Sequence, residues 1–196
     1  MSTLLFIFLS AMLVSLISLI GTVFLLFNRK TLNKILLFFI GLSAGALLSG
    51  AFFHLLFEAI ESSKIELNFI FLYFISGYLF FLFLEKIIKW RHCHDYKCKV
   101  HPFGYMNLIG DFIHNFIDGM IIASSFLISP SFGIITTILI ALHEIPQEIG
   151  DFGVLVYSGF KVKKVILLNF LTALSCVLGA LILSLIHISE PTRQAE

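Results

Sequence analysis

The chain has 196 residues, of which 59% are apolar and 13% charged, with a formal net charge of +1 and a mean hydropathy of +1.02. This composition excludes an ordinary soluble domain and indicates a polytopic membrane protein. A near-neutral chain carries no electrostatic signal for a nucleic-acid partner, and its three cysteines give no disulfide framework.

The first apolar run extends from Leu4 to Phe27 and has a distinctive pair of flanks. No basic residue precedes it, whereas Arg29 and Lys30 follow it. A signal peptide has the opposite flanks and a shorter apolar core. We therefore interpret this run as a permanent membrane helix with its N-terminus outside.

Six segments reach or nearly reach the roughly 20 apolar residues that a helix needs to cross a bilayer. They predict an all-α polytopic transmembrane helix bundle, with residues 1–188 as a single transmembrane domain. The predicted helices are residues 4–27, 34–57, 67–88, 105–128, 131–157 and 164–187.

Basic residues gather in alternate connections between these helices. Eleven of the 13 Lys and Arg residues fall in the first, third and fifth connections. The positive-inside rule places those three connections in the cytoplasm and both chain ends outside. The residues are Arg29, Lys30 and Lys34, then Lys86, Lys89, Arg91, Lys97 and Lys99, then Lys161, Lys163 and Lys164.

The fourth and fifth predicted helices each carry a polar stripe within otherwise apolar sequence. Ionisable groups inside a membrane span cost a few kcal/mol each or more, so they are functional candidates by default. At 3.6 residues per turn, the spacing places each set on one helix face. The stripes are Asp111, His114, Asn115 and Asp118 on one helix, and His143, Glu144, Gln147, Glu148 and Asp151 on the other.

Each stripe offers a histidine with an oxygen ligand one turn further on. Asp118 follows His114 by four residues, and Gln147 follows His143 by four. Two such helices face to face would supply four to six nitrogen and oxygen ligands. That set suits Zn²⁺, Fe²⁺, Mn²⁺ or Cd²⁺ without ranking them.

Several polar residues have two interpretations that the sequence leaves open. Asp111, Glu148 and Asp151 each fit an interhelical hydrogen bond, worth roughly 0.6–2 kcal/mol, or a role in orienting a ligand or relaying protons. His54 and Glu58 lie one turn apart at the outer end of the second predicted helix. They fit an entry relay and an ordinary interfacial position equally well.

Proline and small residues mark places where helices bend or approach each other. Pro146 lacks an N–H and clashes with the carbonyl of Leu142, so we predict a bend in the fifth helix. Transporters use irregular backbone of this kind where it lines a polar cavity. Gly119 gives local backbone room, while Gly179 and Ala180 predict close helix packing.

The connection at residues 89–104 concentrates metal-binding residue types. Three histidines and two cysteines within ten residues resemble a chelating tract, and cytoplasmic thiols stay reduced. The spacing is not that of a closed zinc motif, so a solvated basic loop remains the alternative. The candidate ligands are His92, Cys93, His94, Cys98 and His101.

Two segments carry a family resemblance. HNFIDG at His114–Gly119 and HEIPQEIGD at His143–Asp151 resemble the fourth and fifth helices of the ZIP (Zrt/Irt-like) divalent-metal transporters. The second is close to the HExPHExGD signature of the histidine-rich subfamily, with Gln147 in place of a histidine. The Cys/His loop and Asn169-Phe170-Leu171 resemble prokaryotic members of that subfamily.

The resemblance implies a binuclear metal centre between these two helices. The ligands that it implies are His114, Asp118, His143 and Gln147 at the transport site, and Asn115, Asp118, Glu144 and Gln147 at the adjacent site. It further implies an eight-helix fold. Because six helices are predicted here, we interpret the chain as a truncated reading frame, with residues 189–196 as a candidate non-native tail.

The resemblance also implies a function. We expect an integral protein of a prokaryotic plasma membrane that carries Zn²⁺, or else Fe²⁺ or Mn²⁺, into the cytoplasm, often as a homodimer. A metal-binding fragment that does not transport is the alternative. An intramembrane metalloprotease is disfavoured, because Gln147 replaces the second histidine of HExxH and Pro146 disrupts the helix. We therefore expect no enzymatic activity.

Overall fold

The computed structural model describes residues 3–26, about half of the positions from 31 to 49, and residues 50–62, 64–92 and 101–188. Within those residues the protein is an all-α bundle without strands. Its helical elements are α1 (Thr3–Ile17), η1 (Ser18–Leu26), η2 (Gly50–Leu56), α3 (Phe57–Ser62), α4 (Leu67–His92), α5 (Pro102–Ile128), α6 (Pro130–Tyr157), α7 (Val162–Ala173) and α8 (Ser175–Ile188).

Five stretches of the described chain are long and apolar enough to cross a membrane, as expected for a polytopic bundle. They correspond to the first, third, fourth, fifth and sixth predicted helices. The second predicted helix, residues 34–57, lies partly outside the described residues, and its described end consists of η2 and α3. The five stretches are Thr3–Val23, Leu67–Ile87, Pro102–Ile128, Pro130–Tyr157 and Val162–Ile186.

Three departures from uniform α-helix were not predicted. The first span continues from α1 as the 3₁₀-helix η1, and η2 is a π-helix. The sixth span is interrupted at Leu174, between α7 and α8, where the Ser15 hydroxyl of α1 donates to the carbonyl of Ala173 at 2.7 Å. A hydroxyl that donates to a backbone carbonyl competes with the backbone N–H four residues further along the helix, which would otherwise bond that carbonyl. The helix α6 is continuous through Pro146, and the bend predicted there remains a prediction.

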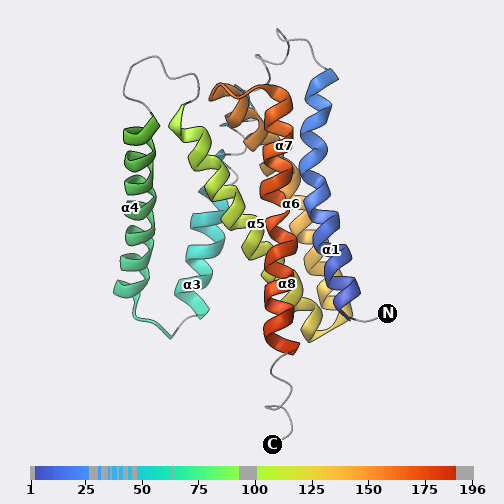
Figure 1. Ribbon diagram of the computed structural model, residues 1–196. Coiled ribbons are helices and arrows are strands. Elements are labelled where there is room, and N and C mark those ends of the chain that lie inside the picture. The colour runs from blue at the N-terminus through green and yellow to red at the C-terminus, as the bar shows by residue number, and fades with distance from the viewer. Residues whose placement is uncertain are drawn as a thin grey trace, which may run out of the picture.

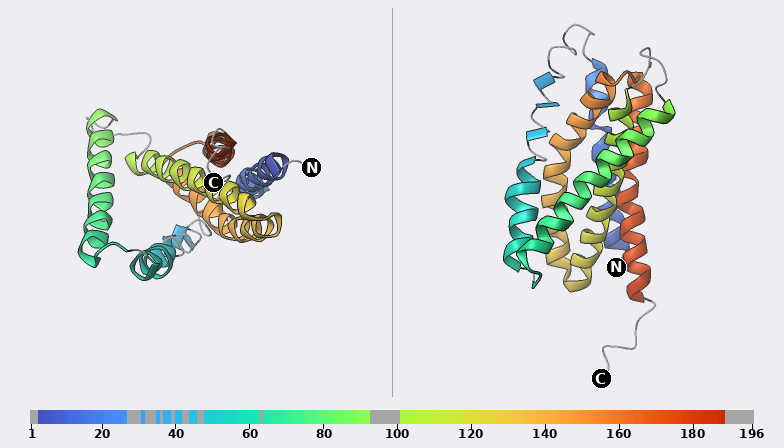
Figure 2. Two further views of the ribbon diagram at one scale, coloured as in Figure 1. Left: turned by 90° about the horizontal axis from the view of Figure 1, so that it is seen from below. Right: turned by 90° about the vertical axis from the view of Figure 1, so that its left-hand side faces the viewer.

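The bundle is built around α5, which contacts α1, α4, α6, α7 and α8. Helices α1, α5, α6, α7 and α8 pack together, whereas α4 stands to one side next to α3 (Figures 1 and 2). One end of the bundle holds the C-terminal end of α4, the start of α5 and the α6–α7 connection (Figure 1). Two of the three basic connections therefore adjoin one end, which we call the basic end.

The contact between α5 and α8 brings two backbones together. A Cβ atom on Gly119 would collide with the carbonyl oxygen of Cys176, and one on Gly179 would collide with the carbonyl oxygen of Phe116. Ala180 is buried beside them. The predicted close packing at Gly179 and Ala180 is thus confirmed, and Gly119 is its partner on α5.

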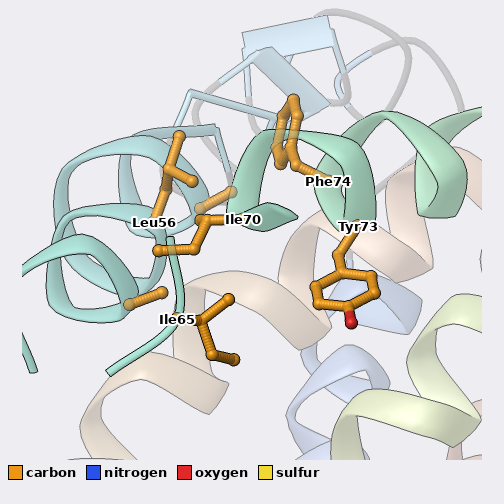
Figure 3. Close-up of a pocket in the computed structure, with 7 residues that line it drawn as sticks. Leu56, Ile65, Ile70, Tyr73 and Phe74 are labelled. Atoms are coloured by element: carbon orange, nitrogen blue, oxygen red, sulfur yellow. The ribbon is translucent and has the colours of Figure 1, made fainter. Parts of the chain in front are cut away.

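An apolar hollow of about 350 Å³ lies between α4 and the η2–α3 segment. Figure 3 shows Leu56, Ile65, Ile70 and Phe74 along its wall, with the Tyr73 hydroxyl as a polar atom among them. No residue of α5 or α6 lines this hollow. Its hydrocarbon lining offers no donor set for a cation, so the polar chemistry of the chain lies elsewhere.

Gly119→Ala should destabilise the protein, because the new methyl group has to push α8 away from α5. Overpacking of this kind typically costs about 1–3 kcal/mol. Thermal unfolding in detergent measures the effect as a lowered Tm. Gly110→Ala is the matched control on the same helix, since a Cβ there meets nothing within 4 Å. Equal Tm values for the two variants would contradict the backbone contact.

Candidate metal centre

A tight turn brings the two polar stripes face to face. Ser129 alone separates α5 from α6, and its Oγ accepts a hydrogen bond from the backbone N–H of Phe132 at 3.1 Å, which caps α6. Antiparallel helices joined in this way pair residues that are equally distant from the turn. His114 lies 15 residues before Ser129 and His143 lies 14 residues after it, so the two imidazoles meet.

Four donor atoms from this pair of helices lie within 4.8 Å of one another: Nε2 of His114 and His143, and a carboxylate oxygen each of Asp118 and Glu144. The two Nε2 atoms are 3.3 Å apart, and His143 Nε2 lies 3.1 Å from Asp118 Oδ2. His114 Nε2 lies 3.5 Å from Glu144 Oε1 and 3.7 Å from Asp118 Oδ2, and His143 Nε2 lies 3.7 Å from Glu144 Oε1.

These distances suit tetrahedral coordination. Zn–N and Zn–O bonds of about 2.0–2.1 Å in a tetrahedron require ligand atoms about 3.3 Å apart. Five of the six ligand–ligand distances in the group lie between 3.1 and 3.7 Å. Small side-chain adjustments would bring all four donors onto one ion.

The orientation of His143 leaves a lone pair for a metal. Its Nδ1 lies 3.3 Å from the backbone carbonyl of Leu139, which can only accept a hydrogen bond. Nδ1 therefore carries the proton in the neutral ring, and Nε2 presents its lone pair to the group. Metal-binding histidines are commonly held in one tautomer by such a bond.

Burial differs between the two kinds of donor. Asp118 and Glu144 are 4% and 1% exposed, whereas the side chains of His114 and His143 are 36% and 46% exposed. Glu144 Oε1 has no hydrogen-bond partner among the described residues. Two buried carboxylates that face two imidazoles form a site in which a divalent cation would compensate the negative charge.

The group lies near the middle of the helices that carry it. At a rise of 1.5 Å per residue, His114 is about 18 Å from the start of α5 and about 21 Å from its end. The hydrocarbon core of a bilayer is about 30 Å thick. With α5 across the membrane, the four donors would lie close to the midplane.

Glu144 and Gln147 differ from the positions that the resemblance implied for them or remain untested as ligands. Glu144 joins His114, Asp118 and His143 in one group, although the resemblance implied it as a ligand of the adjacent ion. Gln147 is buried one turn beyond His143 on α6, and its role as a ligand remains a prediction. Asn115 is fully buried, and its Nδ2 donates to Asp111 Oδ1 at 2.8 Å.

The remaining candidate ligands fall mostly outside the described part of the chain. This holds for the side chains of His54, Glu58 and His92, and for Cys93, His94 and Cys98 altogether. His101 is described and exposed, and it directly precedes α5. Its imidazole ring stacks on Phe103, and its backbone N–H donates to the backbone carbonyl of Ser158 at 2.8 Å.

A second buried polar group includes residues that sequence reasoning missed. Asp111, Glu148 and Asp151 are buried between α5, α6 and α7, and Asn169 Nδ2 donates to Glu148 Oε2 at 3.1 Å. Asn107 lies beside Asp151. Asn107 lies four residues before Asp111 on the same helix face, and this spacing could have identified it as part of the polar stripe.

Comparisons with known proteins show which proteins the chain is similar to. A family model described as ZIP Zinc transporter matches residues 91–196. The chain is 33% identical to "Zinc transporter zipt-7.1" of Caenorhabditis briggsae over 159 residues, which is 64% of this chain and 40% of the relative. It is 42% identical to "Zinc transporter ZIP13" of Pongo abelii over 109 residues, 56% of this chain and 32% of the relative.

A third relative has a different kind of name. "IAA-alanine resistance protein 1" of Arabidopsis thaliana is 54% identical over 78 residues, 39% of this chain and 17% of the relative. The chain thus matches less than half the length of these relatives. All three are eukaryotic, so they give no support to the expected likeness to prokaryotic members. No solved structure matches the chain.

Asp118→Asn and Glu144→Gln should each weaken zinc binding roughly 100-fold, because each exchanges an anionic donor in the group for a neutral amide of the same shape. Isothermal titration in detergent, with Cys93 and Cys98 changed to Ser to exclude the loop thiols, measures the affinity. Ser124→Ala on α5 is the control and should bind zinc as the parent does. Unchanged affinity in both amide variants would disprove the four-donor site.

Proposed function

Because this chain belongs to the ZIP zinc transporter family, we propose that it carries a divalent metal ion, foremost Zn²⁺, across a membrane. The observation that supports this most strongly is the four-donor group of His114, Asp118, His143 and Glu144 midway along α5 and α6. A soluble or structural zinc site does not need to lie at that depth. A transported ion has to be held there, since the bilayer core offers no water to solvate it.

The burial pattern suggests the order in which the ion meets its ligands. The half-exposed imidazoles of His114 and His143 are the first donors that an entering ion reaches, and the buried carboxylates of Asp118 and Glu144 then neutralise its charge. Nitrogen and carboxylate donors replace the hydration shell one by one. Alternating access would expose this same site to each side of the membrane in turn.

A second ion beside the first would require further oxygen donors. We assign Asn115 and Gln147 to it, next to Asp118 and Glu144. Asn115 Oδ1 has no hydrogen-bond partner among the described residues, and Gln147 is buried on the facing helix. Both amides are neutral, so the adjacent site would hold its ion more weakly than the carboxylate–imidazole site does.

The charge pattern supports an orientation of the bundle, and the family resemblance supports transport toward the cytoplasm. The basic connections place the basic end of the bundle in the cytoplasm and the N-terminus outside. Transport would then run from the outer end, past the midplane group, to the basic end. The Cys/His loop at residues 92–101 precedes α5 at that end, where it would capture metal ions as they are released.

Labelling of single cysteines tests this topology. Ser131→Cys in the first turn of α6 should react with a membrane-impermeant maleimide on intact cells, and Lys163→Cys in the first turn of α7 should react only after lysis. The parent for both carries Cys93→Ser and Cys98→Ser, and Cys176 is buried. The reverse pattern would overturn the proposed orientation.

Uptake of radiolabelled zinc into proteoliposomes tests the function itself. The parent chain should accumulate zinc, whereas His143→Ala and Asp118→Ala should lose at least about 90% of the uptake, because each lacks a donor of the group. Ser124→Ala is the control for the substitution of a residue on α5 outside the group.

Two other outcomes would change the conclusion. Stoichiometric zinc binding without uptake by the folded parent would mean that the chain binds metal but does not transport it. Uptake that is equal in the parent and in both variants would mean that zinc crosses without using this group, and it would disprove the proposed mechanism.

A further inference from the structure

Asp111 lies one helical turn before Asn115 on α5, and the two side chains are joined by a hydrogen bond. Asn115 Nδ2 donates to Asp111 Oδ1 at 2.8 Å, and it also donates to the backbone carbonyl of Asp111 at 3.2 Å. Both residues are buried, with Asp111 5% and Asn115 0% exposed. Asp111 is not one of the four donors, so it reaches the metal centre through Asn115.

This contact decides which end of the Asn115 amide faces Asp111. An ionised carboxylate and a backbone carbonyl can only accept hydrogen bonds, whereas Nδ2 is the donor end of an asparagine side chain. The two acceptors of Asp111 therefore hold Nδ2 on their side, and the amide oxygen is held on the other. An amide in place of the carboxylate would not impose this direction, because it donates as well as accepts.

The amide oxygen of Asn115 is the end that a cation would need. Asn115 Oδ1 has no hydrogen-bond partner among the described residues, although the residue is fully buried. Buried polar atoms nearly always have a partner, and an unpaired one costs free energy. Asn115 lies three residues before Asp118, so their Cβ atoms are about 5–6 Å apart on one face of α5. A cation beside Asp118 would supply a partner for this oxygen.

The backbone that carries the pair is held by α8. Ser175 Oγ donates to the carbonyl of Phe112 at 2.7 Å. Gly179 lies so close to the carbonyl of Phe116 that a Cβ atom on the glycine would collide with it. Phe112 and Phe116 directly follow the two residues of the pair, so the pair stands on a rigid part of α5. A ligand is oriented most accurately when its support is rigid.

We propose that Asp111 is a positioning residue, whose carboxylate holds the Asn115 amide with Oδ1 directed at the second ion. This role rests on the second ion of the proposed function. Without the carboxylate the amide could turn and present Nδ2, which is no ligand for a cation, since amides bind metal ions through oxygen. Groups that orient a ligand in this way typically account for about 10–100-fold in metal affinity.

Isothermal titration with zinc in detergent tests this role. The parent carries Cys93→Ser and Cys98→Ser, and it should show two binding events, a stronger one at the four-donor group and a weaker one beside it. Adding Asp111→Ala should weaken the second event at least about tenfold and leave the first within about twofold. Adding Ser124→Ala, on the same helix, should change neither event.

The same substitution in an Asn115→Asp background separates positioning from the loss of a negative charge. A carboxylate at this position has two equivalent oxygens, so its direction no longer matters. Asp111→Ala removes the same charge in both backgrounds. It should therefore weaken the second event at least about fivefold more in the parent than in the Asn115→Asp background. Equal losses in the two backgrounds would overturn the positioning role.

Asp111→Asn covers the case in which Asp111→Ala does not fold, because it keeps the size of the side chain. Its amide can pair with Asn115 in either direction. The productive orientation is then about half populated, so the second event should weaken at least about twofold while the Tm stays close to that of the parent. A second event that neither substitution weakens would overturn the role.

Failure of this role can be told apart from failure of the transport function. A parent that binds one zinc ion only, yet shows zinc uptake that requires His143, would refute the role of Asp111 and support transport. Two binding events that respond to Asp111→Ala as predicted, in a chain that shows no zinc uptake, would support the role and refute transport.

Discussion

Buried carboxylates that face imidazoles inside a membrane span are the constraint on which the rest of the structure depends. Asp118 and Glu144 are removed from solvent in the middle of α5 and α6, where an uncompensated negative charge is costly. His114 and His143 lie 3.1–3.7 Å from their oxygens. A divalent cation would balance this charge. Because binding would remove the cost of burying the carboxylates, that cost would favour binding of the ion.

The surrounding helices keep these donors in place. The turn at Ser129 fixes which residues of α5 and α6 meet, and the collision-free contact of Gly119 with Cys176 holds α8 against α5. Hydroxyl groups tie the interrupted span to its neighbours, since Ser15 donates to Ala173 and Ser175 donates to Phe112. The group is thus carried by the most tightly packed part of the bundle.

The sequence predicted the all-α bundle and the two polar stripes, because both follow from periodicity and from the length of apolar runs. It also predicted close packing at Gly179, since small residues in membrane helices usually mark it. The grouping of Glu144 with His114 was not predicted. Helical spacing locates a residue on a face, but the relative rotation of two helices decides which oxygen points at which imidazole.

Other features were missed for a similar reason. The interruption at Leu174 lies where a hydroxyl of a distant helix bonds the backbone, which local sequence does not reveal, and the 3₁₀ geometry of η1 has no signal in the sequence. The role of Asn169 toward Glu148 depends on how α7 packs against α6. Long-range contacts of this kind decide the polar network, whereas helix length and amphipathicity are local properties.

X-ray absorption spectroscopy of the chain loaded with one equivalent of zinc tests whether the ion binds between His114, Asp118, His143 and Glu144. The spectrum should show a first shell of four nitrogen and oxygen atoms at about 2.0–2.2 Å, with the outer-shell scattering of two imidazoles. A sulfur shell at about 2.3 Å, or a first shell without imidazole, would contradict it by placing the ion in the cysteine-containing loop or on carboxylates alone.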